Sequence, residues 1–246
     1  MSAEKNELLD YIDDKLSADF TEKAVLKQTE FGKVALYRHK KSGENLIKII
    51  SANRNDDVFR RLRGKKSPHL PCIYDVCSTD EYLLVLEEYI PGKNLSDILE
   101  DGPLDRKTAC AYAEQLCDAL SLLHKNGIIH RDVKPSNIII KPDNTLVLID
   151  LSIARCMTNS QEKDTQTLGT VGYAAPEQFG ISQTGRATDI YAMGVLLNMM
   201  LTGVHPAVDL PHGLIRKVVE KSISTQMAKR YQSAQKLKRE IRLFGR

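Results

Sequence analysis

Three polar residues in one short stretch of the chain have the side chains needed to hold a metal ion and to accept a proton. Asp132 and Asn137 precede the apolar run 138–140, and Asp150 follows a second apolar run, 146–149. The Pro-Asp-Asn sequence between the runs is typical of a turn, so we predict a tight hairpin that brings Asn137 and Asp150 together. An amide oxygen and a carboxylate that converge there suit a hard cation such as Mg²⁺. Asp132 would lie near that cation, available to accept a proton from an incoming hydroxyl group.

The order of motifs in and after this stretch resembles the catalytic core of the eukaryotic-type Ser/Thr protein kinases, whose loop reads H-R-D-x-K-x-x-N. The matching loop residues are His130, Arg131, Asp132, Lys134 and Asn137. Asp150-Leu151-Ser152 follows where the family usually has D-F-G, and Ala175-Pro176-Glu177 matches A-P-E. The alternative, a basic surface loop beside an ordinary hairpin, explains neither the order nor the spacing. The resemblance implies an α+β fold of two lobes, a small, mostly antiparallel β lobe and a larger helical lobe.

The resemblance also implies a role for each polar residue of the loop. Asp132 orients the acceptor hydroxyl group and takes its proton, while Asn137 and Asp150 hold Mg²⁺. Lys134 neutralises the γ-phosphate of ATP, and Thr170 of a Gly-Thr pair bonds to Asp132 and Lys134. ATP and Mg²⁺ are therefore the expected cofactors.

Residues 22–50 have the pattern of three strands, and the third strand carries Lys48 inside an apolar run. By the resemblance, Lys48 holds the α- and β-phosphates; the alternative is an edge-strand lysine that points to solvent.

The family's G-x-G-x-x-G-x-V loop is largely lost in the first of these hairpins. Its glycine positions hold Lys27, Thr29 and Gly32, followed by Val34. Glycine lets backbone N–H groups approach phosphate oxygens, so a stiffer or more distant lid is expected. The resemblance still implies that Gly32 and Val34 contact ATP. Lys27 could add charge, but we favour a side chain that points to solvent.

The usual partner of the third-strand lysine is a glutamate on the next helix, which is short here, about Asp56–Arg63, and holds no glutamate. Asp56, Asp57 and Glu87 remain open as partners of Lys48. Both aspartates could equally be first-turn residues that the helix dipole favours. Glu87 falls at the back of the adenine pocket by the resemblance, and a buried carboxylate there requires a partner.

Strands are also expected at Ile73–Val76 and Tyr82–Tyr89. The resemblance places the backbone C=O group of Glu88 and the N–H group of Ile90 against adenine, with Ile139 as the floor below the ring.

The rest of the chain reads as mostly helical. Apolar periodicity predicts a helix over 105–126 and further helices over 189–201, 213–221 and 233–243. The resemblance implies that Glu177 pairs with Arg230, and that Asp189 bonds to the backbone of the catalytic loop. His130 is expected to pack as a core residue.

Residues 153–174 are polar and rich in turn formers, and we interpret them as an activation segment. Its candidate phosphorylation sites are Thr158, Ser160, Thr165 and Thr167, of which we favour Thr165 and Thr167. A phosphate group there would pair with Arg131. Self-association for trans-autophosphorylation is a further expectation.

Composition and hydropathy indicate which partners and which compartment to expect. The 246 residues are 42% hydrophobic and 27% charged, with a formal charge of +3, too small to indicate nucleic acid as a partner. Five cysteines without a C-x-x-C pair suggest reduced thiols in a cytoplasmic protein. No apolar run reaches the ~18 residues of a membrane span, and no signal peptide is evident. We expect a helical extension at 1–21, with amphipathic spacing over 3–16, an N-lobe at 22–89 and a C-lobe at 90–246.

These observations favour an ATP-dependent Ser/Thr protein kinase that acts on protein hydroxyl groups. One alternative is a nucleotide-binding pseudokinase that serves as a regulatory scaffold, supported by the degenerate glycine loop, the short helix and Glu87. A small-molecule phosphotransferase is a second alternative, disfavoured by the A-P-E and Gly-Thr motifs, which serve peptide substrates.

Overall fold

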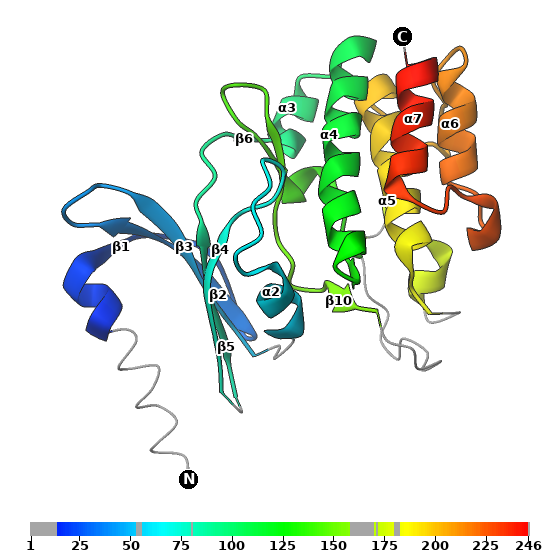
Figure 1. The fold of residues 1–246 in the computed structure, drawn as a ribbon. Helices are drawn as coiled ribbons and strands as arrows, with labels where there is room; N and C mark the ends of the chain where they lie inside the picture. Colours follow the sequence, from blue (N-terminus) through cyan, green and yellow to red (C-terminus); the bar gives the residue numbers. More distant parts are fainter. Residues whose placement is uncertain are drawn as a thin grey trace. The chain divides into compact units, whose positions relative to one another are not determined.

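The computed structural model describes residues 14–52, 56–79, 81–157, 170, 172–179 and 183–245. The chain divides into two compact units, one of residues 1–66 with 71–89 and one of residues 67–70 with 90–246. The first contains a five-stranded antiparallel sheet and the second contains most of the helices (Figure 1). The α+β class expected from the sequence is therefore confirmed.

The sheet of the first unit has the strand order β1-β2-β3-β5-β4. Its members are β1 (Phe20–Thr29), β2 (Gly32–His39), β3 (Asn45–Ser51), β4 (Ile73–Ser78) and β5 (Leu83–Glu88). Branched and aliphatic side chains dominate β3 and β5, which favours a pleated and partly buried surface. β1 differs, because nine of its ten residues are exposed.

Strand register assigns each side chain of the sheet to one of its two faces. Val34 of β2 lies opposite Ile49 of β3, and Ile49 lies opposite Val85 of β5. Residues directly opposite each other in an antiparallel pair share a face, and consecutive residues alternate between faces. Val34, Ile49 and Val85 therefore share one face.

The helix α2 (Asp56–Leu62) contacts that same face at the end of β4. The hydroxyl group of Ser78 donates to Asp56 at 2.7 Å, and Arg60 of α2 donates to Ser78 at 3.1 Å. Ser78 lies opposite Leu83, which shares its face with Val85. We call this side of the sheet the α2 face, and α2 is seen beside the strands in Figure 1.

The second unit is built around buried helices. Its helices are α3 (Leu95–Glu100), α4 (Arg106–Lys125), α5 (Arg186–Thr202), α6 (Ile215–Ser222) and α7 (Ala234–Phe244). Its strands are β6 (Lys93–Asn94), β7 (Ile128–Ile129), β8 (Ile138–Ile140), β9 (Leu146–Leu148) and β10 (Arg155–Cys156). Single turns of 3₁₀ helix occur at Pro135–Asn137, Pro176–Phe179 and Met227–Lys229.

Local sequence accounts for the ends of α4. The side chain of Asp105 accepts a hydrogen bond from the backbone N–H of Thr108, which is the usual N-cap contact. After Asn126, Gly127 has a φ of 72°, the left-handed conformation in which helices commonly end. The predicted helix over 105–126 is confirmed within one residue at each end.

A buried ion pair joins distant parts of the second unit. Arg230 donates to both carboxylate oxygens of Glu177, at 2.7 and 2.9 Å, and the two side chains are 0% and 3% exposed. Thr188 of α5 donates to the same carboxylate at 2.8 Å. The predicted Glu177–Arg230 pair is confirmed, and it connects the segment before α5 to the one before α7.

Some elements differ from the sequence-based predictions. α5 begins at Arg186, three residues before the expected start, because the Thr188 hydroxyl group accepts from the backbone N–H of Gly185 at 3.0 Å and Thr188 N bonds to Gly185 O at 2.9 Å. Ile149 lies outside β9, and the short helix α3 was not predicted. Of the predicted helix over 3–16, residues 1–13 lie outside the described part of the chain, while residues 14–19 are helical.

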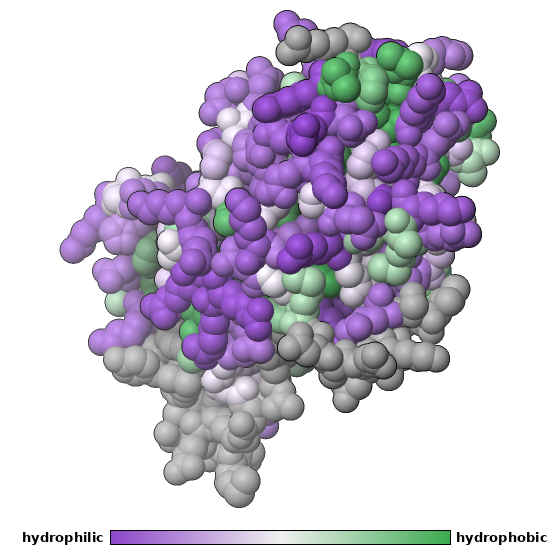
Figure 2. All heavy atoms as spheres, turned by 45° about the vertical axis from the view of Figure 1, so that its right-hand side comes forward, coloured by the Kyte–Doolittle hydropathy of each residue, from purple (hydrophilic) through white to green (hydrophobic). Residues whose placement is uncertain are grey.

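Hydrophilic residues predominate on the face drawn in Figure 2, where hydrophobic residues occupy limited areas.

Among the described residues, no helix has the length and apolar character required to cross a membrane.

Candidate active site

Asp132 is the centre of a hydrogen-bonded cluster in the second unit. One of its carboxylate oxygens accepts from the Thr170 hydroxyl group at 2.8 Å, and the other accepts from the Asn137 amide nitrogen at 2.9 Å and from Lys134 at 2.7 Å. Lys134 also donates to the Thr170 hydroxyl group at 2.7 Å. The Asp132 side chain is 11% exposed. The cluster therefore holds a carboxylate in a fixed orientation while leaving part of it open to an acceptor.

The two contacts expected of Thr170, to Asp132 and to Lys134, are both present. The hydroxyl group accepts a hydrogen bond from the ammonium group and donates one to the carboxylate, so one side chain joins a cation to an anion. Charge-assisted bonds of this kind are stronger than neutral ones. The catalytic roles of these residues remain predictions.

The buried carboxylate of Asp189, in the first turn of α5, fixes the backbone just before Asp132. It accepts from the backbone N–H groups of His130 at 3.0 Å and Arg131 at 2.8 Å, and from the His124 ring at 2.8 Å. Burial acts to raise the pKa of Asp189, but the His124 hydrogen bond and the other donors outweigh it and hold the pKa below its ordinary value. The expected bond from Asp189 to the loop backbone is confirmed.

Two non-glycine residues next to the site adopt left-handed backbone conformations. Arg131 has a φ of 67° and Asp150 has a φ of 64°. Such conformations cost about 1–3 kcal/mol each and persist where surrounding contacts impose them. For Arg131 those contacts include the bond to Asp189, a bond from the Gln178 amide to the Arg131 carbonyl at 2.8 Å, and a bond from the Arg131 guanidinium to Ile153 O at 2.7 Å.

His130 is buried beneath the loop, as expected of a core residue. Its ring bonds to the carbonyl of Ile149 at 3.3 Å and accepts from the backbone N–H of Asp132 at 3.3 Å. Burial lowers the pKa of His130, against the opposing influence of Asp189, Asp150 and Asp132. The neutral ring connects the catalytic loop to the end of β9.

The residues predicted to hold Mg²⁺ have a suitable donor set. The backbone N–H of Ile149 bonds to Asn137 O at 2.8 Å, which keeps Asp150 next to Asn137 across the β8–β9 hairpin. The Asn137 amide nitrogen donates to the backbone and side chain of Asp132, so its oxygen is turned away from those acceptors. An amide oxygen and a carboxylate are hard ligands of the kind that Mg²⁺ takes. The described residues contain no larger His, Cys, Asp and Glu cluster that could hold a metal.

In the first unit, strand register locates Lys48 within the sheet. Lys48 lies opposite Ala35 and Leu86, whereas Val34 lies opposite Ile49. The expected contacts of Lys48 and Val34 with a nucleotide stay predictions.

The three acids considered as partners of Lys48 lie on β5 and α2. Glu87 lies opposite Ile47 of β3. Asp56 pairs with Arg60 at 2.7 Å and accepts from Ser78, and Asp57 belongs to the same helix. The pairing of Lys48 with one of these acids stays a prediction.

Lys48 also lies near Glu22, Lys33 and Tyr37, and we call these four residues the Glu22 cluster. Glu22 accepts from Lys33 at 2.8 Å and from the Tyr37 hydroxyl group at 2.8 Å, and the Lys48 ammonium lies 5.6 Å from the centre of the Tyr37 ring. The hydrogen bonds from Lys33 and Tyr37 lower the pKa of Glu22, and the charge of Lys48 adds to this effect. Lys48 is 3% exposed.

The remaining residues predicted to contact ATP divide between the two units. Gly32 and Val34 lie in β2 and Glu88 ends β5, whereas Ile90 and Ile139 belong to the second unit. A Cβ atom on Gly32 would lie 2.3 Å from the carbonyl oxygen of Ile50, so this retained glycine is required by the β2–β3 contact itself. The backbone N–H of Glu88 bonds to Cys72 O at 2.9 Å.

Comparison with known proteins identifies the family of this arrangement. The family model described as "Protein kinase domain" matches residues 20–244. The chain belongs to the protein kinase domain family. Protein kinase domains as a family use ATP and Mg²⁺, and the donor set at Asn137 and Asp150 is compatible with that use.

The curated proteins that this chain resembles include bacterial Ser/Thr protein kinases. Over 171 residues the chain is 34% identical to a probable serine/threonine-protein kinase of Clostridium perfringens, covering 65% of this chain and 25% of the relative. It is 33% identical over 177 residues to PknB of Mycobacterium tuberculosis, covering 65% and 28%. It is 34% identical over 174 residues to PrkC of Bacillus subtilis, covering 66% and 27%. This kinase domain spans about a quarter of the length of the relatives it matches.

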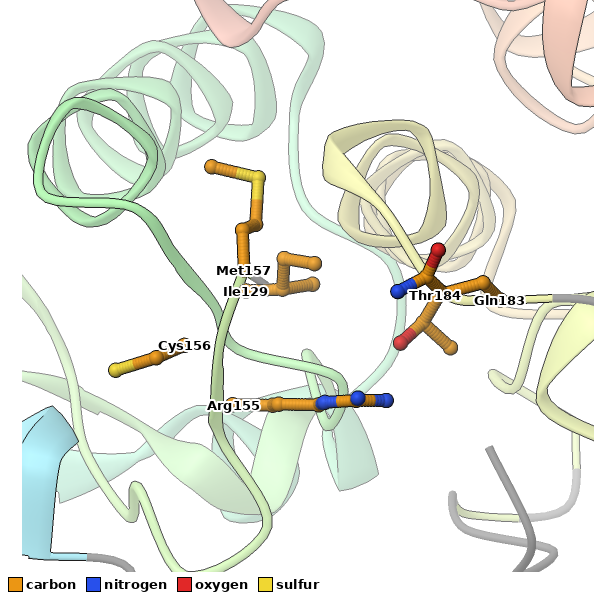
Figure 3. A pocket seen from close by; sticks show the side chains of 6 residues that line it. All are labelled: Ile129, Arg155, Cys156, Met157, Gln183 and Thr184. Atoms are coloured by element: carbon orange, nitrogen blue, oxygen red, sulfur yellow. The ribbon is translucent and has the colours of Figure 1, made fainter. Parts of the chain in front are cut away.

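A cavity of about 140 Å³ lies in the second unit of the kinase domain, and Asp132 is not among its lining residues. It is lined by Ile129, Arg155, Cys156, Met157, Gln183 and Thr184. Figure 3 shows Arg155 extending toward Thr184, while Cys156 points the other way. Arg155 belongs to β10, which follows the Asp150-Leu151-Ser152 motif, so the cavity borders the start of the activation segment rather than the transfer site.

The sequence analysis missed two residues that position the catalytic loop of this kinase domain. The Gln178 side chain donates to Arg131 O and accepts from the backbone N–H of Ala175 at 3.0 Å, so it ties the A-P-E segment to the loop. His124 supplies a third donor to Asp189. A position directly after A-P-E, or in the last turn of a helix, is too weak a signal to reveal either contact.

The candidate phosphorylation sites Thr158, Ser160, Thr165 and Thr167 lie outside the described residues. The expected pairing of Arg131 with a phosphate group stays a prediction.

Proposed function

We propose that the chain is the catalytic domain of an ATP-dependent Ser/Thr protein kinase, which transfers the γ-phosphoryl group of ATP to a protein hydroxyl group. The observation that carries this proposal is the Asp132 cluster, in which Lys134, Asn137 and Thr170 all contact one partly open carboxylate. The names of the relatives in Clostridium, Mycobacterium and Bacillus describe Ser/Thr protein kinases, which supports the proposed acceptor.

In the proposed reaction, a serine or threonine oxygen attacks the γ-phosphorus of ATP, and the bond from that phosphorus to the β–γ bridging oxygen breaks. The γ-phosphoryl group moves to the alcohol, and ADP leaves. Asp132 orients the hydroxyl group and accepts its proton, while Lys134 offsets negative charge on the phosphoryl oxygens. Mg²⁺, when held by Asn137 and Asp150, supplies positive charge near the phosphates. Positioning and charge neutralisation supply most of the catalysis in such reactions.

The proposed nucleotide contacts are those predicted from the sequence. They are Gly32, Val34, Lys48, Glu88, Ile90 and Ile139.

The direct test is phosphate incorporation measured by intact-protein mass after incubation with ATP and Mg²⁺. We expect the wild-type chain to gain mass in steps of about 80 Da, one per phosphate group, and Asp132→Asn to gain none. Asp143→Asn provides a matched control, because Asp143 is an exposed turn residue whose side chain bonds to the nearby backbone N–H of Thr145. Asp143→Asn should incorporate phosphate like the wild type, and equal incorporation in Asp132→Asn would refute the assignment.

A nucleotide-binding pseudokinase is the second candidate, favoured by the degenerate glycine loop, by the short helix α2 and by the buried Glu87. A thermal shift with ATP, without phosphate incorporation into the chain or into an added protein substrate, would support it over the first.

Several finer points belong to the same proposal. The substrate is a protein with a Ser or Thr acceptor, and self-association permits phosphorylation of the activation segment in trans. We retain the extension at 1–21, the lobes at 22–89 and 90–246 and a cytoplasmic location as proposals.

A further inference from the structure

A turn that begins at Thr170 connects the Asp132 cluster to the loop between α5 and α6. The backbone N–H groups of Tyr173 and Ala174 both bond to the Thr170 carbonyl oxygen at 3.0 Å. The hydroxyl group of the same threonine bonds to Asp132 and to Lys134. A movement of this turn would therefore displace the hydroxyl group that orients the Asp132 carboxylate.

His205, in the loop between α5 and α6, contacts the middle of this turn. Its Nε2 bonds to the carbonyl oxygen of Gly172 at 2.9 Å, and its Nδ1 accepts from the backbone N–H of Ala207 at 3.1 Å. A carbonyl oxygen can only accept and a backbone N–H group can only donate, so the hydrogen of the neutral ring is on Nε2. One imidazole thus joins the turn to the loop through both of its nitrogens.

The backbone conformation of Gly172 explains why such a contact matters. Its φ is 90°, which glycine adopts easily but does not impose, because glycine has many other conformations open to it. The direction of the Gly172 carbonyl group therefore depends on its partners. His205 supplies one partner, and the next residue is held by the Tyr173 hydroxyl group, which donates to Met199 Sδ of α5 at 2.7 Å.

The loop that carries His205 is itself fixed by the buried side chain of Asn198 in α5. Asn198 is 0% exposed, and its amide donates to the carbonyl oxygens of Val204 at 2.8 Å and Asp209 at 3.0 Å, on either side of His205. The backbone N–H of Val208 also bonds to His205 O at 2.8 Å. The imidazole is therefore mounted on a loop that is anchored in the core of the second unit.

We propose that His205 is a positioning residue for phosphoryl transfer, because its Nε2–H group holds the turn that keeps Thr170 on Asp132. Hydrogen bonds connect the core residue Asn198 to the loop, and His205 connects the loop to Gly172 of the turn. The proposal rests on the proposed function, since the turn serves the same acceptor site. The sequence analysis assigned no role to His205.

The test uses the fact that asparagine and glutamine each reproduce one nitrogen of the ring. Asparagine places an amide oxygen near Nδ1 and still accepts from Ala207, whereas glutamine places an amide N–H group near Nε2 and still donates to Gly172. In a peptide phosphorylation assay, His205→Asn should lower kcat about three- to tenfold, the scale of one hydrogen bond, with the KM for ATP unchanged. His205→Gln should retain most of the wild-type kcat.

Hydrogen exchange followed by mass spectrometry gives a second readout that does not depend on activity. The backbone amides of Tyr173 and Ala174 should exchange faster in His205→Asn than in the wild type or in His205→Gln. His212→Ala is the matched control, because His212 is an exposed histidine of the same loop and accepts from Arg106 through its backbone carbonyl oxygen. This control should keep both the wild-type kcat and the wild-type exchange.

Two results would overturn the proposal. If His205→Asn matches the wild type in kcat and in exchange, the ring serves only its own loop through Nδ1. If His205→Gln loses as much as His205→Asn, the Nε2–H group is not the cause. A wild-type chain that transfers no phosphate would refute the proposed function instead, and the exchange comparison would still decide whether His205 holds the turn.

Discussion

Replacing Arg230 with methionine should strongly destabilise the second unit. Arg230 is 0% exposed, and its guanidinium donates to both oxygens of Glu177, to Ala187 O at 2.9 Å and to Ser224 O at 2.7 Å. Methionine fills a similar volume but donates nothing, so Glu177 would retain the Thr188 hydroxyl group as a donor and lose its cation. Removing one member of a buried pair costs about 3–5 kcal/mol, because the remaining charge is left uncompensated.

The measurement is thermal unfolding followed by circular dichroism, with chemical unfolding as an independent check. For a domain of this size each kcal/mol corresponds to about 2–4 °C, so Arg230→Met should lower the Tm by about 6–20 °C. Glu177→Gln tests the cause, since it removes the negative charge and keeps the shape.

A double-mutant cycle makes the reasoning refutable. If the uncompensated carboxylate causes the loss, the variant with both Arg230→Met and Glu177→Gln should be more stable than Arg230→Met alone. A Tm within about 2 °C of the wild type for Arg230→Met would show that the ion pair adds little to stability. Strict additivity of the two substitutions would show that the side chains act independently.

Three further predictions test the loop and its surroundings. Thr170→Val removes the hydroxyl group bonded to Asp132 and should lower kcat at least about tenfold, the scale of one hydrogen bond to a charged group, whereas Thr170→Ser should retain most activity in a peptide phosphorylation assay. Burial holds the pKa of His130 below 6.5, so the unfolded chain binds a proton at this histidine before the folded chain does as pH falls. The stability that comes from the neutral ring is complete above pH 6.5 and should decline below it by up to about 1.4 kcal/mol per pH unit. Urea unfolding at several pH values should therefore show a flatter pH dependence in His130→Leu. Gly92→Ala would place a Cβ atom 2.3 Å from the Ile140 carbonyl oxygen and should cost about 1–3 kcal/mol in urea unfolding, a loss that an unchanged midpoint would contradict.

The sequence was most informative where a local pattern and a local structure coincide. The turn residues before Thr145 predict the β8–β9 hairpin, and the hairpin brings Asn137 to Asp150 through the Ile149–Asn137 backbone bond. The spacing of apolar residues likewise predicts α4, because a helix with one buried face requires that period. Both predictions depend on residues close together in the chain.

Strand register could not be predicted from the sequence. Alternation within β3 shows that Lys48 and Ile49 point in opposite directions, but it does not reveal which of them shares a face with α2. That choice depends on the turn between β2 and β3, where Gly43 N bonds to His39 O and His39 N bonds to Glu44 O. One residue more or fewer in this turn would exchange the two faces, and the motif comparison did not resolve that difference.

The left-handed backbone of Arg131 and Asp150 has a consequence for the evolution and engineering of this chain. Glycine would adopt either conformation at little cost. Arginine and aspartate at these positions therefore lower the free energy of unfolding, and in return they place a functional side chain. Screens that select for thermostability alone should therefore favour variants that relax this loop and abolish turnover. A substitution at these two positions that raises thermal stability should lower catalytic activity.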